Sequence, residues 1–250
     1  MHQAWTATIR RISAQLRNDP RTIALVILMP LALVTLLYWV FHDVPVPQGA
    51  PHPFDRVGPI ILVVLPMALM FIVTSVVMLR ERTSGTLERI LTTPLSRWNL
   101  IVSYGIVFGV LALLQVGLLL LVMWSMMGLE IEGSWAVLVA TTAVVALFGV
   151  AFGLLASAFA HTEFQAVQFM PLFVAPQLFL CGLFVAKEDM PKALEVCANL
   201  MPMTWAVDIT RNLTDEATLT GASWGKLALL TAIVLAALLL ASITIRRKTK

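Results

Sequence analysis

Six long runs of apolar residues, separated by short polar stretches, constrain this chain more than any other feature of its sequence. The runs cover residues 22–41, 57–79, 100–127, 135–160, 167–186 and 224–245. A helix needs about 20 mainly apolar residues to cross roughly 30 Å of hydrocarbon, and each run is long enough. The sequence therefore predicts an all-α, polytopic membrane protein with six transmembrane helices.

The overall composition excludes a soluble domain. Hydrophobic residues make up 59% of the 250 residues, and charged residues only 12%. Soluble domains are about 45–50% apolar and about 25% charged. A soluble fold of this size must still cover its surface with polar groups, so it cannot bury such an apolar excess. We expect one transmembrane domain over residues 1–250.

The basic residues predict the orientation of the chain. Twelve of the 17 lie in the N-terminal segment, the 80–99 loop, the 161–165 link and the tail after residue 245. Loops rich in Lys and Arg stay on the cytoplasmic side of a membrane. Both termini are therefore predicted to be cytoplasmic, which agrees with an even number of spans.

Residues 1–21 precede the first span and have a helical pattern. Basic residues lie on the other faces of this pattern. Its apolar face is formed by Trp5, Ile9, Ile12 and Leu16. This pattern predicts an amphipathic helix in the cytoplasmic interface, and a frayed basic tail is the alternative.

The span centres contain no Asp, Glu, Lys, Arg or His. HExxH and GxxxxGK[ST] are absent from the sequence, and Gly221-Ala222-Ser223-Trp224-Gly225 fits GxSxG only at the start of an apolar run, without the strand before it that a nucleophile elbow needs. We therefore predict no catalytic residue, no metal site and no cofactor within this chain. Any vectorial work must then be powered by another polypeptide. The only two cysteines are Cys181 and Cys197, and whether they form a disulfide is left open.

The 80–99 loop is the one substantial loop on the predicted cytoplasmic side. Thr83 or Ser84 can cap a short helix, and Pro94 ends it after about two turns. Its apolar face is formed by Leu87, Ile90 and Leu91. Such a helix suits a groove on a partner, but a solvated connector fits the pattern equally well.

Two stretches of the sequence resemble a known family. The first is Glu81-Arg82-x-x-Gly85-Thr86-Leu87-Glu88-x-Ile90-Leu91-x-Thr93-Pro94-Leu95, and the second runs from Phe179-Leu180-Cys181-Gly182 through Met190-Pro191 to Asn199-Leu200-Met201-Pro202-Met203-Thr204-Trp205-Ala206-Val207-Asp208-Ile209-Thr210-Arg211. Both resemble the ABC-2 type transporter permeases, particularly the daunorubicin-type drug and lipo-oligosaccharide exporter branch. Met201 splits the Asn-Pro pair of that family, and Trp205 replaces its usual Tyr.

The resemblance implies roles for residues in both stretches. The first would be a coupling helix that contacts a separate ATPase subunit, formed by Glu81, Arg82, Gly85, Thr86, Leu87, Glu88, Arg89, Ile90, Leu91 and Pro94. The second would be a re-entrant segment, within the extracellular residues 187–223, that closes the outer end of the path. Its residues would be Pro191, Asn199, Pro202, Thr204, Trp205, Asp208 and Arg211.

The resemblance also implies the function and the partners. The chain would be the permease of an ATP-driven exporter in the plasma (inner) membrane of a prokaryote. It would pair with a second copy or a paralogue, contact membrane lipid and dock two ATPase subunits that bind ATP and magnesium. No nucleic acid partner is expected.

The apolar spans favour a hydrophobic or amphiphilic cargo, such as a drug or a lipid-like molecule. The alternatives are a polysaccharide or lipo-oligosaccharide permease and a membrane scaffold without transport activity. An ion-coupled carrier ranks last, because it would need an ionisable group at membrane depth.

The outer segment has two helical patterns of its own. Pro191 suits the start of the first helix, whose apolar stripe is Met190, Leu194, Cys197 and Met201. The second follows Pro202, with Trp205, Ile209 and Leu213 on one face. We expect both helices to dip into the outer interface, with an ordinary extracellular cap as the alternative. Asp208 and Arg211 are three residues apart and close enough to pair.

Two small-residue motifs predict close helix packing. They are Gly105-x-x-x-Gly109 and Gly149-x-x-x-Gly153. Small residues four apart let two helices approach closely within a membrane. We expect these contacts within one subunit, and dimerisation through the same faces is the alternative.

Overall fold

The computed structural model describes residues 2–45, 52–86, 96–129, 131–215 and 220–244, and these ranges contain helices and no strand. In chain order the elements are α1 (His2–Arg17), α2 (Pro20–His42), α3 (Pro53–Thr83), α5 (Arg97–Met126), α6 (Trp135–Ser157), α7 (Glu163–Leu180), the 3-10 helix η1 (Lys187–Asp189), α8 (Lys192–Leu200), α9 (Pro202–Asp215) and α10 (Gly221–Thr244). The predicted all-α fold is confirmed for this part of the chain.

Five of the six predicted spans are helices long and apolar enough to cross a membrane. They are α2, α3, α5, α6 and α10. The remaining predicted span, residues 167–186, overlaps α7, which does not belong to this group. Glu163 and three glutamines lower the mean hydropathy of α7. The chain is a multi-pass membrane protein.

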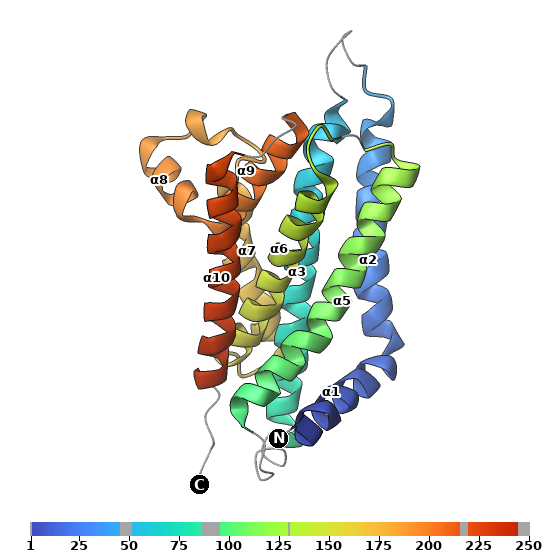
Figure 1. Cartoon of the computed structure of the whole chain (residues 1–250), viewed down its shortest axis with the longest axis vertical. Helices are drawn as coiled ribbons and strands as arrows, with labels where there is room; N and C mark the ends of the chain where they lie inside the picture. The colour runs from blue at the N-terminus through green and yellow to red at the C-terminus, as the bar shows by residue number, and fades with distance from the viewer. Residues whose placement is uncertain (1, 46–51, 87–95, 130, 216–219, 245–250) are drawn as a thin grey trace.

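The long helices lie side by side as a bundle, with α3 near its centre (Figure 1). α3 packs most extensively on α6 and also touches α2, α5, α7 and α9. One end of the bundle carries α1, which crosses beneath α5, and the C-terminal end of α10 (Figure 1). The opposite end carries α8 and α9 (Figure 1). We call these the α1 end and the α9 end.

Glycines of α6 form the seam between α6 and α3. A Cβ atom on Gly149 would collide with the backbone of Met67. On Gly153 it would lie 2.5 Å from the Phe71 carbonyl oxygen and against the hydroxyl of Thr74. The small residues at positions 149 and 153 therefore let two spans of one chain meet backbone to backbone.

The other glycine motif, on α5, makes looser contacts within the same chain. A Cβ on Gly109 would approach the Leu147 side chain of α6 to 2.9 Å. On Gly105 it would only touch Leu238 of α10, at 3.5 Å.

Two helices end at residues other than the ends of the predicted apolar spans. α3 continues through Thr83, so residues 80–83 belong to a helix and not to a loop, because the first breaker is Gly85, with φ of +72°. α7 stops at Leu180, six residues before the predicted end. The chain leaves the helix there because Gly182 takes a φ of +88°. An apolar composition cannot reveal either boundary.

The N-terminal segment forms a helix, α1, as its pattern predicts. Ile12 is buried, and Ile9 and Leu16 are partly buried against the core. The apolar face of α1 is thus turned onto the bundle, where it packs mainly on α5. A frayed tail does not describe this segment.

Candidate functional site

The C-terminal end of α3 ties together three other helices. Arg80, Glu81 and Arg82 are consecutive, and each side chain bonds to a different helix: α7, α1 and α6. Successive helical residues point about 100° apart, so a helix surrounded by neighbours can reach three of them with one triplet. We call Arg80–Glu81–Arg82 the α3 anchor.

Arg80 forms a two-pronged ion pair with Glu163 at the start of α7. The Nε–Oε1 distance is 2.7 Å and the Nη2–Oε2 distance is 2.9 Å. The two side chains are 57% and 53% exposed, so water screens the pair strongly. An exposed pair of this kind contributes about 0.2–1 kcal/mol. The ion pair therefore orients the start of α7 but contributes little to the stability of the bundle.

Glu81 is turned into the bundle and is only 7% exposed. Its Oε1 accepts hydrogen bonds from Gln15 Nε2 at 3.0 Å and from Arg11 Nη1 at 3.4 Å. Arg11 also donates through Nη2 to the Tyr104 hydroxyl of α5, at 3.1 Å. Oε2 of Glu81 is buried without a hydrogen-bond partner among the described residues. Glu81 thus links α3 to α1 with one oxygen still unsatisfied.

Arg82 donates a hydrogen bond to the carbonyl of Ser157, the last residue of α6. The final carbonyls of a helix lack hydrogen-bond partners within the helix and carry partial negative charge. A guanidinium group at this position supplies both a hydrogen-bond donor and a positive charge. Sequence reasoning missed this contact. The signal was a basic residue with no acid three or four positions before it on its own helix, but the acceptor is a backbone carbonyl, which leaves no trace in the amino-acid composition.

The structure covers only part of the predicted coupling segment. Gly85 has the positive φ that separates α3 from Thr86, and the Thr86 hydroxyl lies 2.9 Å from that of Ser84. Leu87, Glu88, Arg89, Ile90, Leu91 and Pro94 lie outside the described residues. The coupling helix therefore stays a prediction, whereas the structure describes the residues that lead into it, up to Thr86.

Asp208 organises a charged cluster at the α9 end. Its Oδ2 accepts from Lys187 Nζ at 2.7 Å and from Lys226 Nζ at 2.5 Å, and its side chain is only 15% exposed. The predicted pairing of Asp208 with Arg211 was wrong. Arg211 donates instead to the carbonyl of Gly182, just beyond α7. One carboxylate near two ammonium groups is already neutralised, so Arg211 is free to bind backbone.

Helix α9 is buried in the bundle and joins α7. Ile209 and Leu213, two of the predicted apolar face, are nearly inaccessible. The amide of Met203 donates to Gln177 Oε1 at 3.4 Å, and the Thr204 hydroxyl lies 3.5 Å from the Leu180 carbonyl. One face of α9 therefore packs on α3, α6, α7 and α10 at this end of the bundle, and whether the segment is re-entrant stays a prediction.

Helix α8 contrasts with α9, because its apolar stripe is not covered by the chain. Pro191 is its N-cap, Leu194 and Cys197 are exposed, and only Ala198 is buried. Asn199 near its end accepts from the Trp205 indole at 2.8 Å, and Pro202 begins α9. Both cysteines are free.

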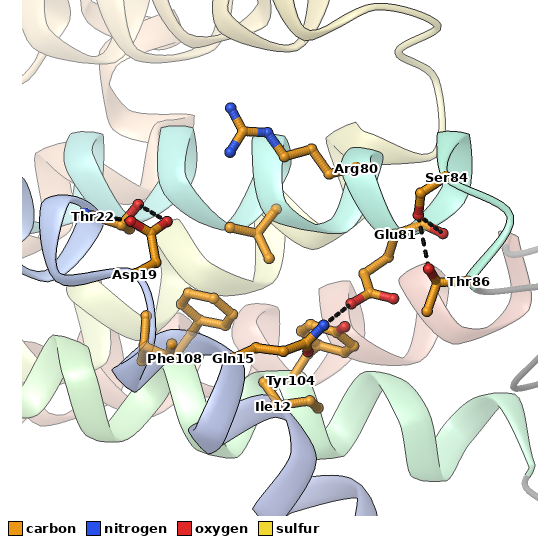
Figure 2. Close-up of a pocket in the computed structure, with 12 residues that line it drawn as sticks. Ile12, Gln15, Asp19, Thr22, Arg80, Glu81, Ser84, Thr86, Tyr104 and Phe108 are labelled. Carbon is orange, nitrogen blue, oxygen red and sulfur yellow. Dashed lines mark hydrogen bonds between the residues drawn. The ribbon is translucent and has the colours of Figure 1, made fainter.

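A cavity of about 250 Å³ lies at the α1 end, between α1, α2, α3 and α5. Figure 2 shows Glu81 directed into it, with Gln15 and Tyr104 converging on it from α1 and α5. Asp19 lies across the cavity and caps α2. Hydrogen bonds from the hydroxyl and the amide of Thr22 hold the pKa of Asp19 below its ordinary value. Sequence reasoning did not predict this cavity, because four separate segments build it.

Comparison with known proteins gives one family match. The family described as "ABC-2 type transporter" matches residues 2–214. This range includes the α3 anchor, the cavity and all of α9 except its last residue.

The chain is also similar in sequence to individual proteins, at low identity. The probable multidrug ABC transporter permease YbhR of Escherichia coli (strain K12) is 29% identical over 63% of this chain and 43% of its own length. YbhS of the same strain is 27% identical, over 57% and 38% respectively. The linearmycin resistance permease protein LnrN of Bacillus subtilis (strain 168) is 29% identical, over 52% and 33%. The chain thus aligns with less than half the length of each.

Proposed function

Because the chain belongs to the ABC-2 type transporter family, we propose that it is the membrane-spanning permease subunit of an ATP-binding cassette exporter. The names of the relatives, two probable multidrug permeases and one linearmycin resistance permease, support a role in exporting drug-like compounds. This chain would supply the path, and ATP and magnesium would bind to a partner.

The proposed topology has six spans in the inner membrane of a prokaryote. α7 would be the sixth, since its 18 residues cover about 27 Å at 1.5 Å per residue and it packs along α3. α1 would lie in the cytoplasmic interface. The position of α1 and of the C-terminal end of α10 at one end of the bundle supports two cytoplasmic termini (Figure 1).

The single observation that carries the proposed mechanism is the α3 anchor. Two ATPase subunits would each dock on the segment that starts at Thr86 of one permease. A displacement of that segment would reach α3 first, because only Ser84 and Gly85 separate the two. Arg80, Glu81 and Arg82 would then pass it to α7, α1 and α6. The α3 anchor would thus pass the displacement of the docking segment on to α7, α1 and α6. The ATPase would not itself contact Glu81.

The proposed path lies between two permeases, either two copies or this chain and a paralogue. One face of α7 is exposed in the single chain and includes Phe164, Gln168 and Leu172. A glutamine exposed to hydrocarbon has no hydrogen-bond partner, which is costly. A second subunit or a cavity between subunits would remove that cost. Such a mainly apolar surface favours amphiphilic cargo, and Asp208 with Arg211 would keep the outer end closed.

The test is ATP-dependent export by the chain in membrane vesicles, together with a candidate ATPase that carries Walker motifs. Charge reversal at Glu88 and Arg89 should abolish both co-purification and export of a fluorescent amphiphile. Reversal of Glu188, at the α9 end, is the matched control and should leave both unchanged. ATP hydrolysis by the purified chain alone, or labelling of residues 85–97 from outside the cell, would contradict the proposal. Co-purification without any transport would favour a scaffold.

A further inference from the structure

The outer side of α2 carries an apolar stripe with a basic residue at one end and an aromatic residue at the other. Arg21 lies at the α1 end and Trp39 at the α9 end, and both side chains are exposed. Every exposed residue of α2 between these two is apolar. Helical spacing places four of them on the same face as Arg21 and Trp39. We call these four the α2 stripe: Leu25, Leu28, Ala32 and Leu36.

The α2 stripe spans the hydrocarbon layer of a membrane. Trp39 follows Arg21 by 18 residues, which is about 27 Å of helix at 1.5 Å per residue. The hydrocarbon layer is about 30 Å thick. Tryptophan is enriched where hydrocarbon meets the headgroups, and a long arginine side chain next to hydrocarbon extends its guanidinium group to the same level. Arg21 therefore lies at the level of the lipid headgroups.

The α2 stripe differs from the exposed face of α7 in what can cover it. Gln168 on α7 is a polar group that hydrocarbon leaves without a hydrogen-bond partner. The α2 stripe has no such group. It also lacks two small residues four apart, which would let the helix of a second subunit approach closely. The surface of α2 therefore fits lipid, whereas the surface of α7 calls for a partner.

The basic residues near the start of α2 give this lipid-facing surface a positive border. Arg10 and Arg17 are exposed on α1 and seven residues apart, so they share one face of that helix. Neither forms an ion pair with a described residue. Asp19 lies near Arg21, but its oxygens already accept hydrogen bonds from Thr22. The three arginines and this one aspartate leave a net charge of +2.

The other acids at the α1 end do not offset this charge. Glu81 is paired with Arg11, and Glu163 is paired with Arg80. Residues 17–21, where α1 passes into α2 at the edge of the bundle, therefore keep an excess of positive charge beside the α2 stripe (Figure 1). We call these residues the α1–α2 bend.

We propose that the α1–α2 bend binds the headgroup of an anionic phospholipid. The guanidinium groups of Arg17 and Arg21 donate to the phosphate oxygens, and an acyl chain lies along the α2 stripe. A zwitterionic phospholipid carries a cation of its own, so the net charge of the bend selects a headgroup with net negative charge. A free phosphate ion would leave the α2 stripe without a partner. The inference does not depend on the proposed function, because it concerns the binding of lipid by the chain itself.

Native mass spectrometry of the purified full chain in a neutral detergent tests the proposal. The probes are phosphatidylglycerol and phosphatidylcholine with identical acyl chains, added at equal concentrations. Phosphatidylglycerol should bind at least about tenfold more tightly, because each arginine beside an anionic headgroup contributes about fivefold. Equal affinities for the two lipids would overturn the proposal.

Variants of the two arginines assign this preference to the α1–α2 bend. Arg17→Gln combined with Arg21→Gln should lower the affinity for phosphatidylglycerol about tenfold or more, to that for phosphatidylcholine. Arg17→Lys combined with Arg21→Lys keeps both charges and should retain most of the affinity. The matched control is Arg56→Gln, which removes an exposed arginine at the α9 end and should leave the affinity unchanged. All three side chains are exposed, so each variant should keep the unfolding midpoint of the unmodified chain. An equal loss of affinity in the control and in the double Gln variant would overturn the proposal.

A photolabel locates the acyl chain on the surface of the protein. The chain is placed in phosphatidylcholine vesicles that contain a trace of phosphatidylglycerol with a diazirine in one acyl chain. The label should appear on peptides that contain the α2 stripe, and the double Gln variant should reduce it there. A second copy of the chain that covers α2 would protect the stripe, and the label would then appear on other helices. That result would overturn the proposal.

Discussion

The two ends of the bundle both carry buried or half-buried carboxylates, but they satisfy them differently. At the α9 end, Asp208 receives two ammonium groups from segments on both sides of α9, at 2.7 and 2.5 Å. At the α1 end, Glu81 receives one longer guanidinium bond and one amide bond, and its second oxygen is bare. The carboxylate at the α9 end thus has two cationic donors, whereas the carboxylate at the α1 end has one oxygen without a donor.

This difference indicates which end moves more easily. A carboxylate shared by two lysines must lose both before α9 can shift. The bonds of the α3 anchor are single, long or exposed, so each can exchange for another at small cost. The α1 end is also where the family resemblance predicts the ATPase contact. The molecule thus combines a stiff α9 end with an adjustable α1 end.

Gly153→Ala should have the largest effect, because the α3–α6 seam connects both ends. The new methyl group collides with Phe71 and Thr74, and overpacking of this kind costs about 3 kcal/mol. We expect a markedly lower thermal unfolding midpoint, with both ends lost together. Gly105→Ala is the control, with a change of less than about 1 kcal/mol, since it meets only Leu238 at 3.5 Å. Equal unfolding midpoints for the two variants would show that the close α3–α6 contact at Gly153 does not determine the stability of the two ends.

Asp208→Asn should destabilise the α9 end by about 2 kcal/mol. Two lysines then lose their shared carboxylate, and their partial exposure of 25% and 31% reduces the cost below that of a fully buried pair. Hydrogen exchange should quicken in α9 and stay unchanged in α1. Faster exchange confined to α1 would reverse the ranking of the two ends.

Arg11→Met should loosen the α1 end by about 1 kcal/mol. It removes the bonds to Glu81 and Tyr104 but keeps an apolar side chain of similar length. The measurement is again hydrogen exchange, now with α1 quickened and α9 unchanged. An exchange rate in α1 equal to that of the unmodified chain would show that packing on α5 alone holds this helix.

Glu163→Gln should change stability by less than about 0.5 kcal/mol, since its pair with Arg80 is more than half exposed. The small difference from the unmodified chain should vanish in molar salt, as expected for a screened surface pair. Unfolding midpoints at low and high salt measure it. A large effect that persists in salt would mean that α7 depends on the α3 anchor for its stability.

Asp19→Asn should have the smallest effect, visible only through pH. The pKa of Asp19 is lowered in the folded chain, so its stabilising contribution is complete above its ordinary value of 3.8 and is lost as pH falls through the folded pKa. The unmodified chain should lose its advantage over Asp19→Asn as the pH falls below the ordinary pKa of 3.8. Asn still caps α2, which isolates the charge. A difference between the two chains that does not vary with pH would contradict this assignment.

Much of the fold could be predicted from the sequence, because hydrocarbon demands long apolar helices. Five predicted spans correspond to α2, α3, α5, α6 and α10, and the apolar face of α1 was also anticipated. The sixth predicted span was less well defined. Glutamines along α7 weaken its apolar signal, and Gly182 ends the helix early.

The candidate site was harder to predict because its bonds cross between helices. The motif that begins at Glu81 pointed to this region, yet it suggested a surface for a partner where Glu81 is turned inward. Asp208 and Arg211 looked like a pair because they are neighbours on one helix. Lys187 and Lys226 replaced Arg211 as partners of Asp208, from 21 and 18 residues away.

The sequence by itself determined that this chain lies in a membrane, how its apolar runs divide it and where its basic residues gather. Each of these follows from the cost of placing polar groups in hydrocarbon, which acts on every residue separately. Only the tertiary structure decided which helices meet the α3 anchor, which carboxylate is left with a bare oxygen and where a cavity opens. These depend on distances of a few ångström between segments far apart in the chain, and no local pattern encodes them.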